Sequence, residues 1–332
     1  MTFVLDRSAI LNHPRLLFLN DILPIETYLT ALEQAINDIF VRRGDRVVQH
    51  GRVIVLRATD HDRLVSAFKS AIYLGNYHDL QNRTRFLKRM VKLEHSYEPI
   101  RGESLLFLFI GVGKPVYDHL ITYSVGRTTR IAAGQRANLP WGYEIPVEAR
   151  DLSLYREEPL ARIREVVYRV QKLRDAHDGD GQEERPEQIQ ALRSTLPVGY
   201  IMPPFLLEFS EEALIKHVFR QRLFEKGAQG ATVEVVADMW EATRQIDPEK
   251  WETLLDYHGP HLAHWRRAMR TLRDQKITLK TLLHDAGVAF TETSTGELVV
   301  KDLLLYDLLM ETVGKLPPSM WEKEQEQKGA RR

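Results

Sequence analysis

Three arginines stand close together in a short segment that contains no acidic residue. In VGRTTRIAAGQR, residues 125–136, small and apolar residues surround Arg127, Arg130 and Arg136. A planar guanidinium group can pair with a phosphate or a carboxylate through two parallel hydrogen bonds. The segment therefore predicts either a site for an anionic ligand or an exposed loop whose arginines pair with acids elsewhere in the chain.

Another arginine falls on the apolar side of a predicted helix. In SEEALIKHVFRQRLFEKGAQG, residues 210–230, Arg222 follows Leu214 by eight positions and Val218 by four. This spacing places Arg222 on the inward stripe and leaves Arg220 on the solvated face. Because an unpaired buried charge is costly, an inward Arg222 requires either an internal carboxylate or a bound anion.

Two further groups of polar residues have ordinary structural explanations. Gln229 opens the apolar face of the next predicted helix, where its amide must bond to backbone or to a ligand. In HGPHLAH, His258 precedes a Gly-Pro break, and no acidic residue accompanies His261 and His264. Cap and surface positions explain these histidines better than a zinc site, so we predict no metal.

Bulk properties exclude several classes of protein. Lys and Arg together number 46, as do Asp and Glu, so no net charge attracts nucleic acid or an anionic membrane. The absence of cysteine removes disulfides, thiolate catalysis and Cys-ligated metals. The chain contains no membrane-length apolar segment, no signal peptide pattern, no P-loop and no Rossmann fingerprint. We expect a cytoplasmic protein without nucleic-acid or membrane partners.

The hydrophobic patterns predict an α+β fold with a small, mostly antiparallel sheet flanked by helices. The main expected elements are a hairpin or bulged strand pair at 45–60 around Gly51, a helix at 62–76 ending at Gly75, a strand at 103–110 followed by a helix from Pro115, a helix at 151–175, a loop at 175–188, a strand at 205–209, a helix N-cap at Ser210 and a hairpin at 288–300. We expect an α/β core over residues 1–250, including an N-terminal elaboration, and a mainly helical C-terminal extension over 251–332.

Four segments, in this order, resemble the flavin-dependent thymidylate synthase (ThyX) family. They are LEH at 93–95, YSVGRTTR at 123–130, LRSTLP at 192–197 and FRQRLFEKGAQGATVEV at 219–235. The resemblance covers roughly residues 85–245 and implies a ThyX-like fold for the core. It also implies a homotetramer with sites between subunits.

The resemblance assigns roles to eight residues. Those implied to contact FAD are His95, Arg127, Thr128 and Gln229. Those implied to bind the nucleotide are Arg193, Arg130 and Arg136. Arg222 is similar to the arginine that polarises the uracil ring, and it is the implied catalytic residue.

The implied reaction is methylation or reductive modification of a pyrimidine nucleotide at C5, with dUMP as the family's usual substrate. FAD would be the cofactor, and NADPH and methylenetetrahydrofolate would be co-substrates. The flavin-dependent route is thought to need no cysteine nucleophile, in agreement with the composition. The signature departs from the family, however, because its first Arg and its His are Val125 and Gly126 here. A flavoprotein acting on another nucleotide, or a non-catalytic nucleotide-binding or assembly protein, therefore stays open.

Overall fold

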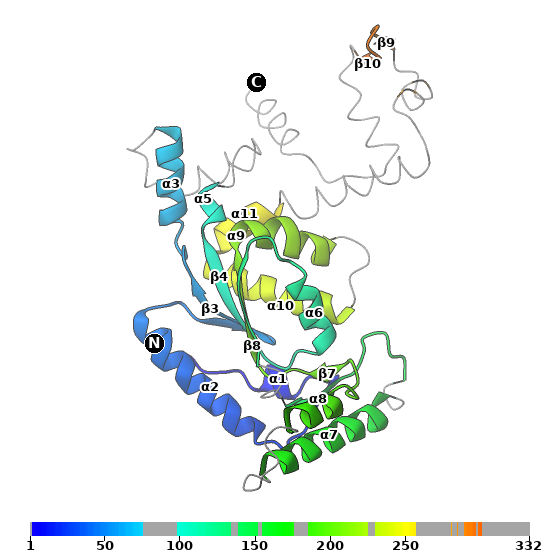
Figure 1. The fold of residues 1–332 in the computed structure, drawn as a ribbon. Coiled ribbons are helices and arrows are strands. Elements are labelled where there is room, and N and C mark those ends of the chain that lie inside the picture. Colours follow the sequence, from blue (N-terminus) through cyan, green and yellow to red (C-terminus); the bar gives the residue numbers. More distant parts are fainter. Residues whose placement is uncertain are drawn as a thin grey trace. The chain divides into compact units, whose positions relative to one another are not determined.

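The computed structural model describes residues 2–75, 98–133, 139–151, 155–175, 185–224, 230–256, 280, 284, 289–296 and 298–300 (Figure 1). The chain divides into two compact units, Met1–Glu252 and Thr253–Arg332. Among the residues just given, no helix is long and apolar enough to cross a membrane. The site analysed below lies in the first unit.

The main sheet has five strands in the order β2-β3-β4-β8-β5, and every neighbouring pair is antiparallel. Its strands are β2 (Val48–His50), β3 (Val53–Ala58), β4 (Ser104–Phe109), β8 (Phe205–Ser210) and β5 (Arg127–Ile131). Gly51 joins β2 to β3 at a φ of 52°, a left-handed conformation that favours glycine. The predicted hairpin at 45–60 and the predicted strands at 103–110 and 205–209 are confirmed.

A second, three-stranded antiparallel sheet pairs distant parts of the chain. It contains β1 (Leu16–Phe18), β6 (Gly142–Glu144) and β7 (Tyr200–Ile201), in that order. Strands of two or three residues are too short for a recognisable alternation, so the sequence did not reveal them. In the second unit, β9 (Phe290–Glu292) and β10 (Leu298–Val300) form the predicted hairpin. The predicted α+β fold with antiparallel sheets flanked by helices is confirmed.

The described helices and helical turns are α1 (Ser8–Leu11), α2 (Ile25–Ile39), η1 (Val41–Arg43), α3 (Leu64–Leu74), α5 (Glu98–Arg101), α6 (Lys114–Ile121), α7 (Glu157–Asp175), α8 (Arg185–Arg193), α9 (Glu211–Ala213), η3 (Leu214–Phe224), α10 (Gly230–Ile246) and α11 (Pro248–Asp256). As predicted, α3 ends at Gly75, and the Ser210 side chain caps α9 by accepting a hydrogen bond from the Ala213 amide at 3.2 Å. α8 begins inside the segment that was predicted as a loop.

One face of the five-stranded sheet is aromatic and lies under the helices. Phe109 of β4 stacks on Phe205 of β8, with ring centres 4.8 Å apart, and Tyr117 of α6 meets Phe205 edge-on at 4.9 Å. α10 packs against β2 and β3 and also contacts α6 and η3. Figure 1 shows α6, α9 and α10 gathered on this side of the strands. The helix-covered face is therefore where α6 meets the sheet.

A buried ion pair joins the two sheets just before α6. Arg52, which precedes β3, donates from Nη1 to the carboxylate of Glu144 in β6 at 2.6 Å, and both side chains are at most 5% exposed. The same guanidinium nitrogen donates to the carbonyl oxygen of Gly111 at 3.3 Å, and Glu144 accepts from the Gly113 amide at 2.8 Å. Both partners therefore hold the turn from which α6 begins.

We expect Arg52→Met to lower the free energy of unfolding by about 3–5 kcal/mol, because it leaves the buried carboxylate of Glu144 without its cation. Urea unfolding followed by circular dichroism measures this change. The control is Arg57→Met, since Arg57 is 44% exposed and pairs with Glu208 at 3.1 Å, and an exposed pair contributes only about 0–1 kcal/mol. Equal losses in the two variants would contradict the role of the buried pair.

Candidate functional site

Both described arginines of the opening segment face the helices because β5 contains a bulge. On a regular strand, residues three apart point to opposite faces of the sheet. Here Arg127 lies opposite Phe209 and Arg130 lies opposite Leu207, with a shift of register between them. Phe209 and Leu207 are both on the helix-covered face. The bulge leaves Thr128 exposed as the extra residue and directs both arginines to the same side.

These two arginines contact one segment, residues 117–123, which comprises the last part of α6 and the turn after it. Arg127 donates from Nη1 to the carbonyl oxygen of Ile121. Arg130 donates from Nε to the hydroxyl of Tyr117 at 2.8 Å. The contacts hold the two side chains against α6 and leave further guanidinium donors for a ligand.

Arg222 of η3 contacts the same segment at Tyr123. Its guanidinium carbon lies 5.3 Å from the centre of the Tyr123 ring, within the range of a cation–π contact. Arg222 is half-buried, and its buried Nε makes no hydrogen bond to a residue that the structure describes. We call Arg222, Arg127 and Arg130 the α6 arginine cluster.

The α6 arginine cluster has no internal acid to neutralise it within the described parts of the chain. No ion pair joins any of its three members to an Asp or Glu there. On α6 itself, Lys114 and Asp118 pair with each other, so Asp118 is already engaged. Arg127 and Arg222 are half-buried, whereas Arg130 is exposed apart from its contact with Tyr117. Guanidinium groups without a carboxylate partner fit a phosphate or carboxylate supplied by a ligand.

The sequence prediction for Arg220 is wrong, and the reason is the geometry of η3. Arg220 is only 5% exposed, whereas the helical spacing placed it in solvent. η3 is a π-helix, whose turn is wider than that of an α-helix, so α-helical spacing does not predict which of its residues share a face. Arg220 follows the fully buried Ile215 by five positions. The same widening moves Arg222 from the predicted inward stripe to a half-buried position beside α6.

His119 lies beside the α6 arginine cluster and was not among the predicted site residues. Its Nδ1 lies 2.9 Å from the hydroxyl oxygen of Thr232, in the first turn of α10. Burial lowers the pKa of His119, and the charge of Arg222 lowers it further, while Asp118 raises it. The position of His119 along α6 fits an ordinary amphipathic helix, so the sequence gives no sign of a special role. Its neighbours Thr232 and Arg222 belong to α10 and η3, which only the folded structure brings beside α6.

Gly126 stands where the resemblance to the ThyX family implies a His, and its surroundings leave no room for a side chain. Gly126 has a φ of 73°, and a Cβ atom there would lie 2.6 Å from the Ser210 hydroxyl oxygen and 2.6 Å from the Ala213 Cβ. Its carbonyl also accepts a hydrogen bond from the Ser210 amide at 2.6 Å. The N-cap of α9 therefore occupies the space that a side chain at position 126 would need.

The remaining predicted residues are not brought to the α6 arginine cluster by the described structure. Arg193 is half-buried at the end of α8, which packs beside α7 and away from α9 (Figure 1). The residues outside the described ranges are His95, Arg136, Gln229, His258, His261 and His264. Within those ranges, no three His, Asp or Glu side chains form a group that could hold a metal ion.

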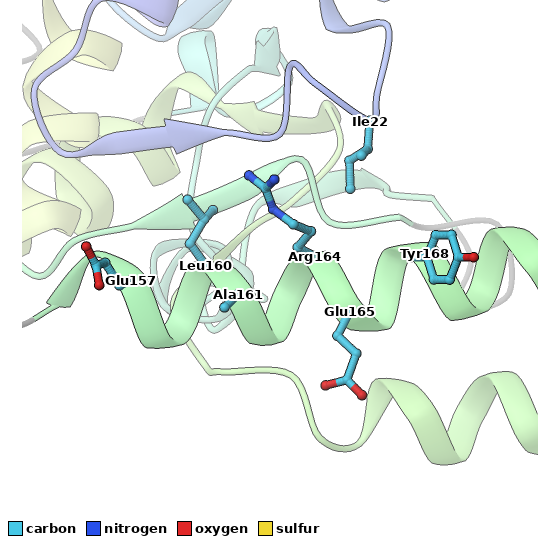
Figure 2. A pocket seen from close by; sticks show the side chains of 7 residues that line it. All are labelled: Ile22, Glu157, Leu160, Ala161, Arg164, Glu165 and Tyr168. Carbon is cyan, nitrogen blue, oxygen red and sulfur yellow. The ribbon is translucent and has the colours of Figure 1, made fainter.

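A separate groove runs along α7. It has a volume of about 530 Å³ and is lined by Ile22, Glu157, Leu160, Ala161, Arg164, Glu165 and Tyr168. Figure 2 shows six of these side chains following one another along α7, with Ile22 approaching from a neighbouring segment. None of the predicted site residues that the structure describes lines this groove, which is therefore distinct from the α6 arginine cluster.

No family model and no curated protein matches the chain. Among solved structures, it is similar to a UMP/dUMP methylase PolB from Streptomyces cacaoi, bound with 5-Br dUMP, at a TM-score of 0.41 and 13% sequence identity. The match covers 64% of this chain and 97% of that chain. Similarity at this level places the chain in no family.

We expect Arg222→Gln to raise the pKa of His119 toward the ordinary value of about 6.5, because it removes a nearby positive charge. NMR titration of the His119 ring carbons measures the change. In the unchanged protein, the imidazole should stay neutral to a lower pH than a free histidine. Arg130→Gln is the control, since Arg130 contacts Tyr117 instead. An identical titration of His119 in all three proteins would show that Arg222 does not act on it.

Proposed function

We propose that this protein is a flavin-dependent enzyme that modifies a pyrimidine nucleotide at C5, with dUMP methylation as the reaction implied by the resemblance to the ThyX family. The observation that carries the proposal is the α6 arginine cluster. Its three guanidinium groups contact one segment, residues 117–123, and have no carboxylate partner within the described residues. Such a cluster suits a ligand that brings its own negative charge.

The donor set fits both a nucleotide phosphate and the diphosphate of FAD. In this proposal Arg127 and Arg130 bind phosphate oxygens through the nitrogens that α6 leaves available, and the exposed Thr128 adds a hydroxyl donor. When bound, FAD would supply the electrons and relay the one-carbon unit from methylenetetrahydrofolate, with NADPH as the reductant. The role of the protein is then to orient the ligands and to stabilise charge.

Arg222 is the residue we assign to charge stabilisation. It is half-buried against the aromatic ring of Tyr123, where an electrostatic interaction is stronger than in open water. A guanidinium held there would stabilise negative charge that develops on the pyrimidine ring in the course of modification at C5. His95, Gln229 and Arg136 keep the roles implied by the resemblance. Arg193 would complete the nucleotide site from another subunit of a homotetramer.

One observation favours a divergent enzyme as a second candidate. The packing of Gly126 against Ser210 and Ala213 excludes the signature His from its family position. A flavoprotein that acts on a nucleotide other than dUMP accommodates this departure more readily than a standard thymidylate synthase does. Reoxidation of the reduced flavin in the presence of different nucleotides separates the two candidates.

The first test is the absorption spectrum of the purified protein, before and after FAD is added and free FAD removed. We expect a bound flavin spectrum and reoxidation of the reduced flavin that depends on a pyrimidine nucleotide. Arg222→Gln should lower kcat by about 10²–10³-fold, as the loss of one charge-stabilising donor does elsewhere. Arg57→Gln, on the opposite face of the sheet, is the control and should retain activity.

A protein that stays colourless and does not retain FAD would contradict the flavoenzyme proposal. We would then interpret the protein as a non-catalytic protein that binds a nucleotide. Full activity in Arg222→Gln would remove Arg222 from the mechanism even if the flavin is bound.

A further inference from the structure

His119 is held in a fixed orientation beside Arg222. Its Nδ1 is bonded to the hydroxyl of Thr232, whose side chain is fully buried at the start of α10. Its other ring nitrogen, Nε2, makes no hydrogen bond to a residue that the structure describes. A half-buried imidazole with one nitrogen bonded and the other available can orient a ligand group.

We infer that His119 is a specificity-determining residue that accepts a hydrogen bond from the N3–H of a uracil-type base through Nε2. This inference rests on the proposed function, because it names the base that the nucleotide site would select. It assigns to Thr232 the role of a positioning residue, which accepts a hydrogen bond from Nδ1–H and so leaves Nε2 as the acceptor.

The argument follows from the hydrogen-bonding groups of the base. Uracil presents an N–H donor at N3 between two carbonyl acceptors. Arg222 has donors only and matches a carbonyl oxygen, but it cannot accept from N3–H. A complete match therefore needs an acceptor next to the guanidinium. Asp118 is paired with Lys114, whereas Nε2 of His119 makes no hydrogen bond to a described residue, so His119 is the acceptor that we assign.

The surroundings of His119 keep this acceptor available. Burial and the Arg222 charge from η3 both lower its pKa, and they outweigh the opposing charge of Asp118 on α6. The imidazole is therefore neutral near pH 7 and retains a lone pair. Cytosine carries an acceptor at N3 and an amino donor at C4, so it would leave both His119 and Arg222 mismatched. The site should prefer uracil over cytosine.

The test is a binding cycle that combines a protein change with a ligand change. Isothermal titration calorimetry with the full chain gives the Kd of dUMP and of N3-methyl-dUMP for the unchanged protein and for His119→Ala. Each single change should weaken binding by about 10- to 100-fold, the effect of one lost hydrogen bond in a desolvated site. The two changes together should cost no more than either alone, because both remove the same hydrogen bond.

Control variants separate orientation from general damage. Thr232→Ser keeps the hydroxyl and should retain the preference for dUMP over its N3-methyl analogue, whereas Thr232→Val should lose it. His61→Ala changes an exposed histidine and should bind both ligands as the unchanged protein does. Circular dichroism confirms that each variant is folded.

The outcomes distinguish the two proposals. If the unchanged protein binds dUMP but the two losses simply add, His119 does not contact N3–H and the inference is wrong, while the nucleotide site stands. N3-methyl-dUMP binding as tightly as dUMP would also overturn the inference. If the unchanged protein binds neither ligand, the proposed function fails and the inference fails with it.

Discussion

The buried ion pair between Arg52 and Glu144 bonds to the turn from which α6 begins, and the candidate site depends on that helix. The pair joins the five-stranded sheet to the three-stranded sheet, and its two members bond to Gly111 and Gly113 in the turn between β4 and α6. A Cβ at Gly113 would lie 2.4 Å from the Glu144 carboxylate, so the turn packs directly on the pair. Two buried charges gain little net stability, but they tolerate few alternative arrangements.

Residues from three other elements contact α6 and the turn that follows it. β5 supplies Arg127 and Arg130, η3 supplies Arg222, and α10 supplies Thr232. Two irregularities of the backbone accompany these contacts: a bulge in β5 and the π-helical geometry of η3. Such irregularities disturb regular hydrogen bonding and are frequent next to functional sites. Both direct an arginine toward α6, in agreement with a ligand-binding role for the α6 arginine cluster.

Local signals in the sequence predicted much of the fold, and long-range contacts account for most of what it missed. Gly51, Gly75 and the N-cap Ser210 each act within a few residues, so the hairpin, the helix end and the helix start could be predicted. The Arg52–Glu144 pair joins residues 92 positions apart, which no local pattern reveals. The β5 bulge and the π-helix depend on tertiary packing. Regular periodicity therefore assigned Arg220 to the wrong face and gave no reason to place His119 in the site.

The central claim is that the α6 arginine cluster receives a nucleotide, and a crystal structure of the protein with dUMP and FAD tests it most directly. The account predicts that the nucleotide lies against residues 117–123, with phosphate oxygens bonded to Arg127 or Arg130 and the base next to Arg222. A nucleotide bound elsewhere, for example in the groove along α7, would contradict the claim. So would a structure in which these arginines pair with carboxylates of the protein itself.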